Sequence, residues 1–189
     1  MTYSKASGYP VVASSLSAAL PLSASVGSNA LTATLASGAV LDFVVNGTWT
    51  PVTLASDISV TVSSGSTLGT TSNVKSRIWV VALYNGGTPE LAVINCQMGA
   101  AGITPLSIHE TVSTTAEGGA GAADSATVVY STTARSNVAY RVIGYIESTQ
   151  ATAGTWATAP STIQGAGGQA VTAMSSLGYG QTWQDVTGS

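Results

Sequence analysis

Residues 78–94 read IWVVALYNGGTPELAVI. Two runs of aliphatic, aromatic and β-branched side chains flank Asn85-Gly86-Gly87, and these turn residues are typical of a tight hairpin. The stretch therefore predicts two antiparallel strands. In residues 78–84 both alternating sets of side chains are apolar. We expect both faces of this strand to be covered, either by a second subunit or by the chain's own arms.

The same signals recur along the chain. Residues 138–146 (VAYRVIGYI) form a second run that is apolar on both alternations, and Asn46-Gly47 separates two β-prone runs in a second hairpin pattern. Further strands are predicted at residues 31–35, 40–45, 48–54, 58–62, 107–112 and 126–130, with a flexible Gly/Ala loop at 116–123. We expect an all-β fold, an antiparallel β-sandwich, over residues 29–164.

The two ends of the chain have other patterns. Residues 1–28 carry Pro10 and Pro21 among Ser and Ala, and we interpret them as an extended N-terminal attachment arm that orders when it docks. Residues 165–189 are interpreted as a Gly-rich linker, a short helix and a neck leading to a further domain. The apolar stripe of that helix includes Met174 and Leu177. A helix of about ten residues is marginal alone in water, so the stripe needs a partner.

Charge is scarce in this sequence. Only 7% of the residues are charged, against about 25% in ordinary domains, and Ser and Thr supply roughly a quarter of the chain. A surface of hydroxyl groups suits close contact between copies of a subunit, because no charges need be desolvated. The five basic residues form no extended cluster, so we expect no nucleic-acid partner. No apolar run is long enough to cross a bilayer, so we expect no membrane insertion.

No pattern of catalytic residues is recognisable. The sequence has one histidine, His109, and one cysteine, Cys96, so it lacks the repeated His and Cys spacings of a zinc site. The eight carboxylates are spread singly, so no glycosidase pair can be identified. Cys96 lies in an apolar run and is expected to be buried. We therefore expect no enzyme activity, no catalytic residues, no metal and no cofactor.

Four residues are candidates for a subunit interface: Trp79, Arg141, Met174 and Leu177. Arg141 interrupts an apolar strand, so it either pairs with a carboxylate or backbone carbonyls, or reaches solvent at a sheet edge. Trp79 also lies in an apolar strand, which favours the core. Trp49 and Trp156 lie near turns. They suit either packing, which we favour, or stacking on a sugar ring.

Residues 136–184 resemble a segment of bacteriophage and prophage structural proteins. The resemblance rests on YRVIGYI (140–146), AGTW (153–156), APSTIQG (159–165) and GYGQTW (178–183), and it extends over roughly residues 29–189. In similar proteins the last of these segments leads into a further domain. The family brings no catalytic residues.

This resemblance implies a virion structural protein, assembled in the host bacterial cytoplasm as a homotrimer. It would be a phage fibre or spike that attaches to other virion proteins through its N-terminal arm and presents a distal host-receptor-binding part. Two alternatives remain open. One is a capsid decoration or head-fibre protein, and the other is a module that binds a host surface glycan.

Overall fold

The structure, a computed structural model, describes residues 22–96, 111–119 and 121–165. Within these ranges the chain forms strands and no helix. The predicted C-terminal helix with Met174 and Leu177 lies outside the described residues. The strands are β1 (Leu22–Gly27), β2 (Ala30–Leu35), β3 (Val40–Val45), β4 (Thr48–Thr53), β5 (Ile58–Val62), β6 (Ser76–Asn85), β7 (Thr88–Asn95), β8 (Thr111–Val112), β9 (Thr115–Ala116), β10 (Tyr130–Ser131), β11 (Val138–Ser148) and β12 (Thr162–Gly165).

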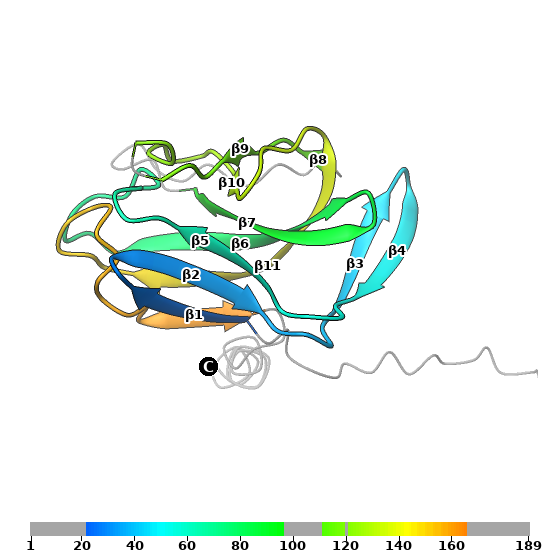
Figure 1. Ribbon diagram of the computed structural model, residues 1–189, viewed down its shortest axis with the longest axis horizontal. Coiled ribbons are helices and arrows are strands. Elements are labelled where there is room, and N and C mark those ends of the chain that lie inside the picture. The colour runs from blue at the N-terminus through cyan, green and yellow to red at the C-terminus, as the bar shows by residue number, and fades with distance from the viewer. Residues whose placement is uncertain (1–21, 97–110, 120, 166–189) are drawn as a thin grey trace, which may run out of the picture.

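The strands form two layers and a projecting hairpin (Figure 1). A three-stranded sheet, in the order β1-β2-β5, lies over a larger sheet in the order β12-β11-β6-β7-β10-β9, in which β8 also pairs with β11. The hairpin β3–β4 stands at one end. Each described strand pairing is antiparallel except that between β9 and β10, which is parallel. The all-β, sandwich-like fold predicted from the sequence is confirmed.

Both predicted hairpin turns are present. Asn46 and Gly47, with φ of 50° and 75°, connect β3 to β4, and Gly86 and Gly87, with φ of 55° and 98°, connect β6 to β7. Left-handed backbone at consecutive turn residues matches the twist of the paired strands, which explains why Asn and Gly occupy these positions. The register that follows pairs Val44 with Trp49 in the first hairpin.

The main core fills the space between the two layers. It includes Leu31 and Leu35 of β2, Val60 and Val62 of β5, and inward side chains of the central strands. The central strands contribute Ile78, Val80, Ala82, Leu91, Val93, Ala139, Ile143 and Ile146. Each fully buried Leu, Ile or Val contributes about 1.5–3 kcal/mol relative to an exposed position. The burial of these side chains explains why apolar and polar residues alternate along the strands.

The opposite face of β6 is also buried. Val81 and Leu83 have no exposed surface within the single chain, and they belong to a second cluster with Ala92, Ile94 and Cys96. The sequence left open whether a second subunit or the same chain covers this face. The structure shows that the chain itself covers it. The buried position expected for Cys96 is also found, and burial raises the pKa of its thiol.

The body begins earlier than the predicted boundary at residue 29. β1, at Leu22–Gly27, pairs with β2 along its whole length, from Leu22 opposite Leu35 to Gly27 opposite Ala30. Ser28 and Asn29 make the connecting turn with φ of 52° and 59°. β1 therefore belongs to the folded body and not to the arm expected over residues 1–28, because its apolar side chains pack against the core.

A second difference concerns residues 126–130, for which a strand was predicted. Only Tyr130 and Ser131 form a strand there. Thr127 has a left-handed φ of 67°, and its N–H donates to the carbonyl of Asn95 at 2.6 Å. This turn holds the segment against the end of β7, so the apolar residues pack without strand pairing.

The Gly/Ala segment predicted to be a flexible loop is held by its carboxylate. Glu117 accepts hydrogen bonds from the backbone N–H of Ser63 at 3.0 Å and from the hydroxyls of Ser63 and Ser66 at 2.8 and 2.6 Å. These bonds join the start of the loop to the end of β5, across more than fifty residues of sequence.

Candidate functional site

A pocket of 300 Å³ opens beside strand β7. β10 pairs with β7 only through Tyr130 opposite Val93 and Ser131 opposite Ala92. After Ser131 the chain leaves the sheet, and the space between this departing loop, β5 and the start of β7 forms the pocket. Its lining consists of Ile58, Ser59, Pro89, Glu90, Leu91, Thr132, Thr133 and Arg135.

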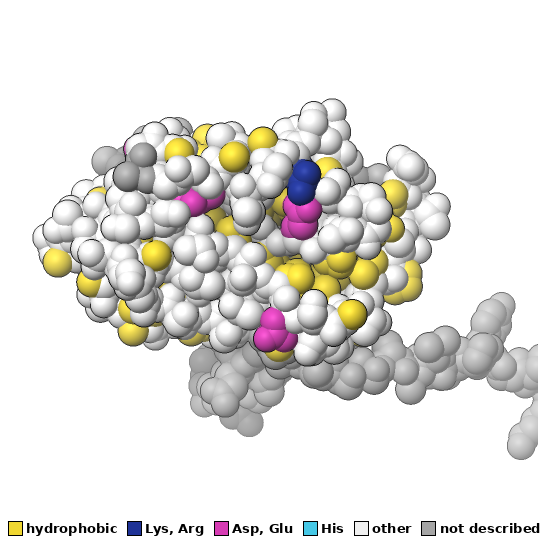
Figure 2. All heavy atoms as spheres, viewed as in Figure 1, with side chains coloured by type: hydrophobic (Ala, Val, Ile, Leu, Met, Phe, Trp, Pro, Cys, Tyr) yellow, Lys and Arg dark blue, Asp and Glu magenta, His cyan; other side chains and the backbone are white. Residues whose placement is uncertain are grey.

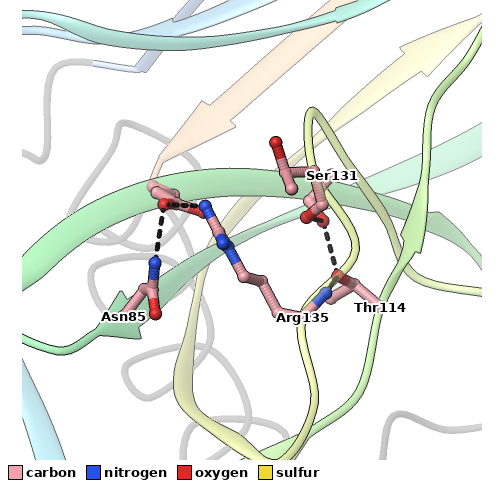
Figure 3. Close-up of polar contacts among 6 residues, drawn as sticks. Asn85, Thr114, Ser131 and Arg135 are labelled. Carbon is pink, nitrogen blue, oxygen red and sulfur yellow. Dashed lines mark hydrogen bonds and ion pairs between the residues drawn. The ribbon is translucent and has the colours of Figure 1, made fainter.

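An ion pair forms one wall of the pocket. Arg135 donates from Nε to Oε2 of Glu90 at 2.8 Å and from Nη2 to Oε1 at 2.5 Å. Asn85 adds a bond from Nδ2 to Oε1 at 3.2 Å (Figure 3). The two charged side chains are only 25% and 24% exposed, so this two-point contact is partly shielded from solvent. Such bidentate pairs fix the orientation of both groups.

The ion pair is charged on both sides at neutral pH. Burial alone would raise the pKa of Glu90, but the hydrogen bonds from Arg135 and Asn85 outweigh it, and the pKa lies below its usual value. The hydrogen bond to Glu90 raises the pKa of Arg135. The carboxylate and the guanidinium therefore cancel each other's charge inside the pocket.

Hydroxyl groups behind the pocket hold its loop in place. The N–H of Arg135 donates to Oγ1 of Thr114 at 2.9 Å, and its carbonyl accepts the N–H of Thr114 at 2.8 Å. The hydroxyls of Thr114 and Ser131 are 2.5 Å apart, and Ser131 also donates to the carbonyl of Thr133 at 2.8 Å. Figure 3 shows Arg135 reaching from this anchored loop toward the carboxylate that Asn85 also contacts.

The remaining lining divides into a polar rim and an apolar floor. Ser59, Thr132 and Thr133 are exposed, whereas Ile58 and Pro89 are half-buried and Leu91 is buried. On the face drawn in Figure 2, apolar side chains gather in a hollow below adjoining basic and acidic side chains. The pocket therefore offers hydrogen bonds at its mouth and carbon surface beneath.

The candidate interface residues do not form one site. Trp79 is half-buried and meets Tyr145 edge-on, with the ring centroids 5.3 Å apart. Arg141 pairs across the strands with Ala82, which lies on the opposite face of β6 from Trp79 because side chains alternate. Met174 and Leu177 lie outside the described residues.

Two of the tryptophans have opposite environments. Trp49, at the start of β4, is 72% exposed, and its cross-strand neighbour Val44 is half-buried. Trp156 is fully buried and donates from Nε1 to the carbonyl of Ser66 at 2.9 Å. Trp156 thus packs in the core, as the sequence favoured. Trp49 instead presents an exposed aromatic ring on the projecting hairpin.

Glu90 and Arg135 were not recognised as a pair in the sequence. They are 45 positions apart and come together only because the loop after β10 folds back beside β7. Neither residue lies in a motif, so no sequence signal distinguishes them from the other scattered charges. Among the described residues no three metal-ligating side chains gather, and no helix there is long and apolar enough to cross a membrane.

Comparison with known proteins adds no relative. The chain has no significant match to a family model, to a curated protein or to a solved structure.

Proposed function

We propose that the chain is a non-catalytic structural subunit of a bacteriophage particle, within a fibre or spike that attaches to the virion and presents a distal receptor-binding part. The proposal starts from the resemblance of residues 136–184 to phage structural proteins. One property of the folded body supports it further, namely the way its few charges are arranged.

Each Lys and Arg in the described ranges is bound to a carboxylate of the same chain. Glu147 holds Lys75 at 2.6 Å and Arg77 at 2.5 Å. The other pairs are Arg135 with Glu90 and Arg141 with Asp42. Since every described cation already has its counter-ion, the surface left for contacts is dominated by hydroxyl and small apolar side chains.

Such a surface favours assembly over the binding of charged partners. On the outer face of the smaller sheet, Thr32 and Thr61 hydrogen-bond to each other through their hydroxyls at 3.0 Å. Another copy or another virion protein packing here would desolvate no unpaired cation, and burying an unpaired ion is strongly unfavourable. The described body therefore suits a role in which proteins pack side by side.

A homotrimer remains part of the proposal and rests on the resemblance. The doubly apolar strand β6 no longer requires a second subunit, since one chain buries both of its faces. The exposed Val40 and Trp49 on the projecting hairpin are apolar groups that a neighbouring copy would cover. Light scattering at micromolar concentration checks this directly, with a trimer mass expected and a monomer mass counting against it.

The experiment for this function is fractionation of particles. Gradient-purified virions and tailless heads, prepared from the phage or prophage that encodes the chain, are analysed by mass spectrometry. We expect the chain in complete particles and not in tailless heads. Its presence in tailless heads would favour a capsid decoration or head-fibre protein instead, and its absence from both preparations would contradict a structural role.

A further inference from the structure

We propose that the pocket between β5, β7 and the Thr132–Arg135 loop binds one neutral sugar ring, an uncharged ligand rich in hydroxyl groups. This inference is independent of the proposed role in a particle. It rests on the size of the pocket, on its charge balance, on the arrangement of its polar and apolar lining, and on its rigidity.

Size limits the ligand to about one ring. The pocket holds 300 Å³. That volume is at the lower end of the range for small-molecule sites, roughly 300–1,000 Å³. A ligand of this size leaves the remainder of any longer glycan in solvent, beyond the exposed Thr132 and Thr133.

Charge balance favours a neutral ligand. Glu90 and Arg135 are the charged residues among those that line the pocket, and they neutralise each other through two hydrogen bonds. A phosphate or carboxylate ligand would be repelled by Glu90, and an ammonium ligand by Arg135. A charged ligand that bound either residue would break the bidentate pair and leave the other charge in the pocket without its counter-ion.

The polar groups match hydroxyls in particular. The bonds to Glu90 use two of the five N–H donors that a guanidinium carries, so Arg135 presents donors beside an accepting carboxylate. A sugar hydroxyl both donates and accepts, and neighbouring ring hydroxyls bridge such a pair. Ser59, Thr132 and Thr133 add hydroxyls at the rim, and Ile58 and Leu91 provide carbon surface for the C–H face of the ring.

The walls are positioned before any ligand arrives. Thr114 bonds to both the N–H and the carbonyl of Arg135, and Ser131 holds the carbonyl of Thr133. A ligand therefore does not have to order this loop, and the entropic cost of binding is smaller.

Isothermal titration and saturation-transfer NMR on the purified chain test the proposal. The probes are glucose, galactose, mannose and N-acetylglucosamine, with glucuronate and inorganic phosphate as charged comparisons. We expect millimolar binding of at least one neutral sugar, and no binding of the two anions.

Two variants locate the binding. The double substitution Thr132→Val with Thr133→Val removes both rim hydroxyls at nearly constant shape, and Thr53→Val is the matched control on an exposed strand outside the pocket. We expect an affinity loss of about tenfold or more in the double variant and none in the control. A third variant, Glu90→Gln, leaves Arg135 without its counter-ion and should allow glucuronate to bind.

Three outcomes would overturn the inference: no neutral sugar binds, the double variant binds as well as the control, or phosphate binds better than the sugars in the unmodified protein. Thermal melts establish that each variant is folded. Particle fractionation and sugar titration use different samples, so failure of one proposal is distinguishable from failure of the other.

Discussion

The guanidinium of Arg141 on β11 lies 3.1 Å from the carboxylate of Asp42 on β3. The contact joins the projecting hairpin to the large sheet across 99 positions of sequence. The two side chains are 36% and 47% exposed. Of the two alternatives that the sequence left open for Arg141, pairing with a carboxylate is found within one chain, and the paired side chain is still partly exposed to solvent.

Because this ion pair is open to solvent, we predict that Arg141→Met and Asp42→Asn have small and similar effects. Each should lower the free energy of unfolding by less than about 1 kcal/mol, as is usual for screened pairs. A double-mutant cycle by denaturant unfolding measures the coupling. A loss of about 3 kcal/mol or more in either single variant would mean that the surviving charge is stranded in a dry environment.

The two contrasting tryptophans give a second prediction. Trp156→Ala should lower the free energy of unfolding by about 3–5 kcal/mol, because it empties a fully buried site and leaves the carbonyl of Ser66 without its donor. Trp49→Ala is the matched control and, measured on the dissociated monomer, should leave the melting temperature unchanged, since within one chain the ring is 72% exposed. Equal shifts in the two variants would contradict the packing described for the core.

Gly144 of β11 lies opposite Gly165 of the neighbouring strand β12. The pairing of β11 with β6 shifts between Val142 and Gly144, and a Cβ added at Gly144 would lie 2.0 Å from the carbonyl oxygen of Gln164. We predict that Gly144→Ala costs about 3 kcal/mol in the free energy of unfolding, or displaces β12. Gly27→Ala, where no atom lies within 4 Å of the added carbon, should be tolerated. Chemical denaturation of both variants makes the comparison.

Glu147 predicts a pH dependence. Hydrogen bonds from Lys75 and Arg77 lower its pKa to about 2, from an ordinary value of 4.5. A carboxyl that is more acidic in the folded state stabilises the fold fully above its unfolded pKa, and this contribution is lost as the pH falls from 4.5 toward 2.

The corresponding experiment compares thermal melts of the native chain and Glu147→Gln at several pH values. At neutral pH the variant should be less stable by about 1 kcal/mol, a figure reduced for the exposure of Lys75 and Arg77. The difference in stability between the native chain and the variant should become steadily smaller below pH 4.5. A gap that stays constant down to pH 2.5 would show that the ion pairs are not its origin.

Local patterns were enough to predict most of the strands. The turns at Asn46-Gly47 and Gly86-Gly87 carry residues that tolerate left-handed backbone, and the runs beside them became β3, β4, β6 and β7. β1 was missed although Leu22, Ala24 and Val26 alternate with serine. Pro21 and the Ser/Ala composition obscured that alternation. Its pairing with β2 depends on a tight turn at Ser28 and Asn29 that the sequence signals weakly.

The candidate pocket was not predictable in the same way. Ser59, Glu90 and Arg135 come from β5, β7 and a loop after β10, and only the tertiary fold brings them together. The strand predicted at residues 126–130 failed for a related reason. Its apolar residues are satisfied by packing, and the left-handed turn at Thr127 is stabilised by a distant carbonyl, that of Asn95.

The central claim is tested most directly by electron microscopy of purified particles labelled with a gold-conjugated antibody against the body at residues 22–165. We predict label at one fixed part of each complete particle, retained after a high-salt wash. The matched sample carries a chain lacking residues 1–21. Because β1 begins at Leu22, this chain should keep its folded body but lose the label from particles if the N-terminal arm mediates attachment. Particles that carry no label with the intact chain, while the folded protein accumulates free in the lysate, would contradict a structural role in the virion.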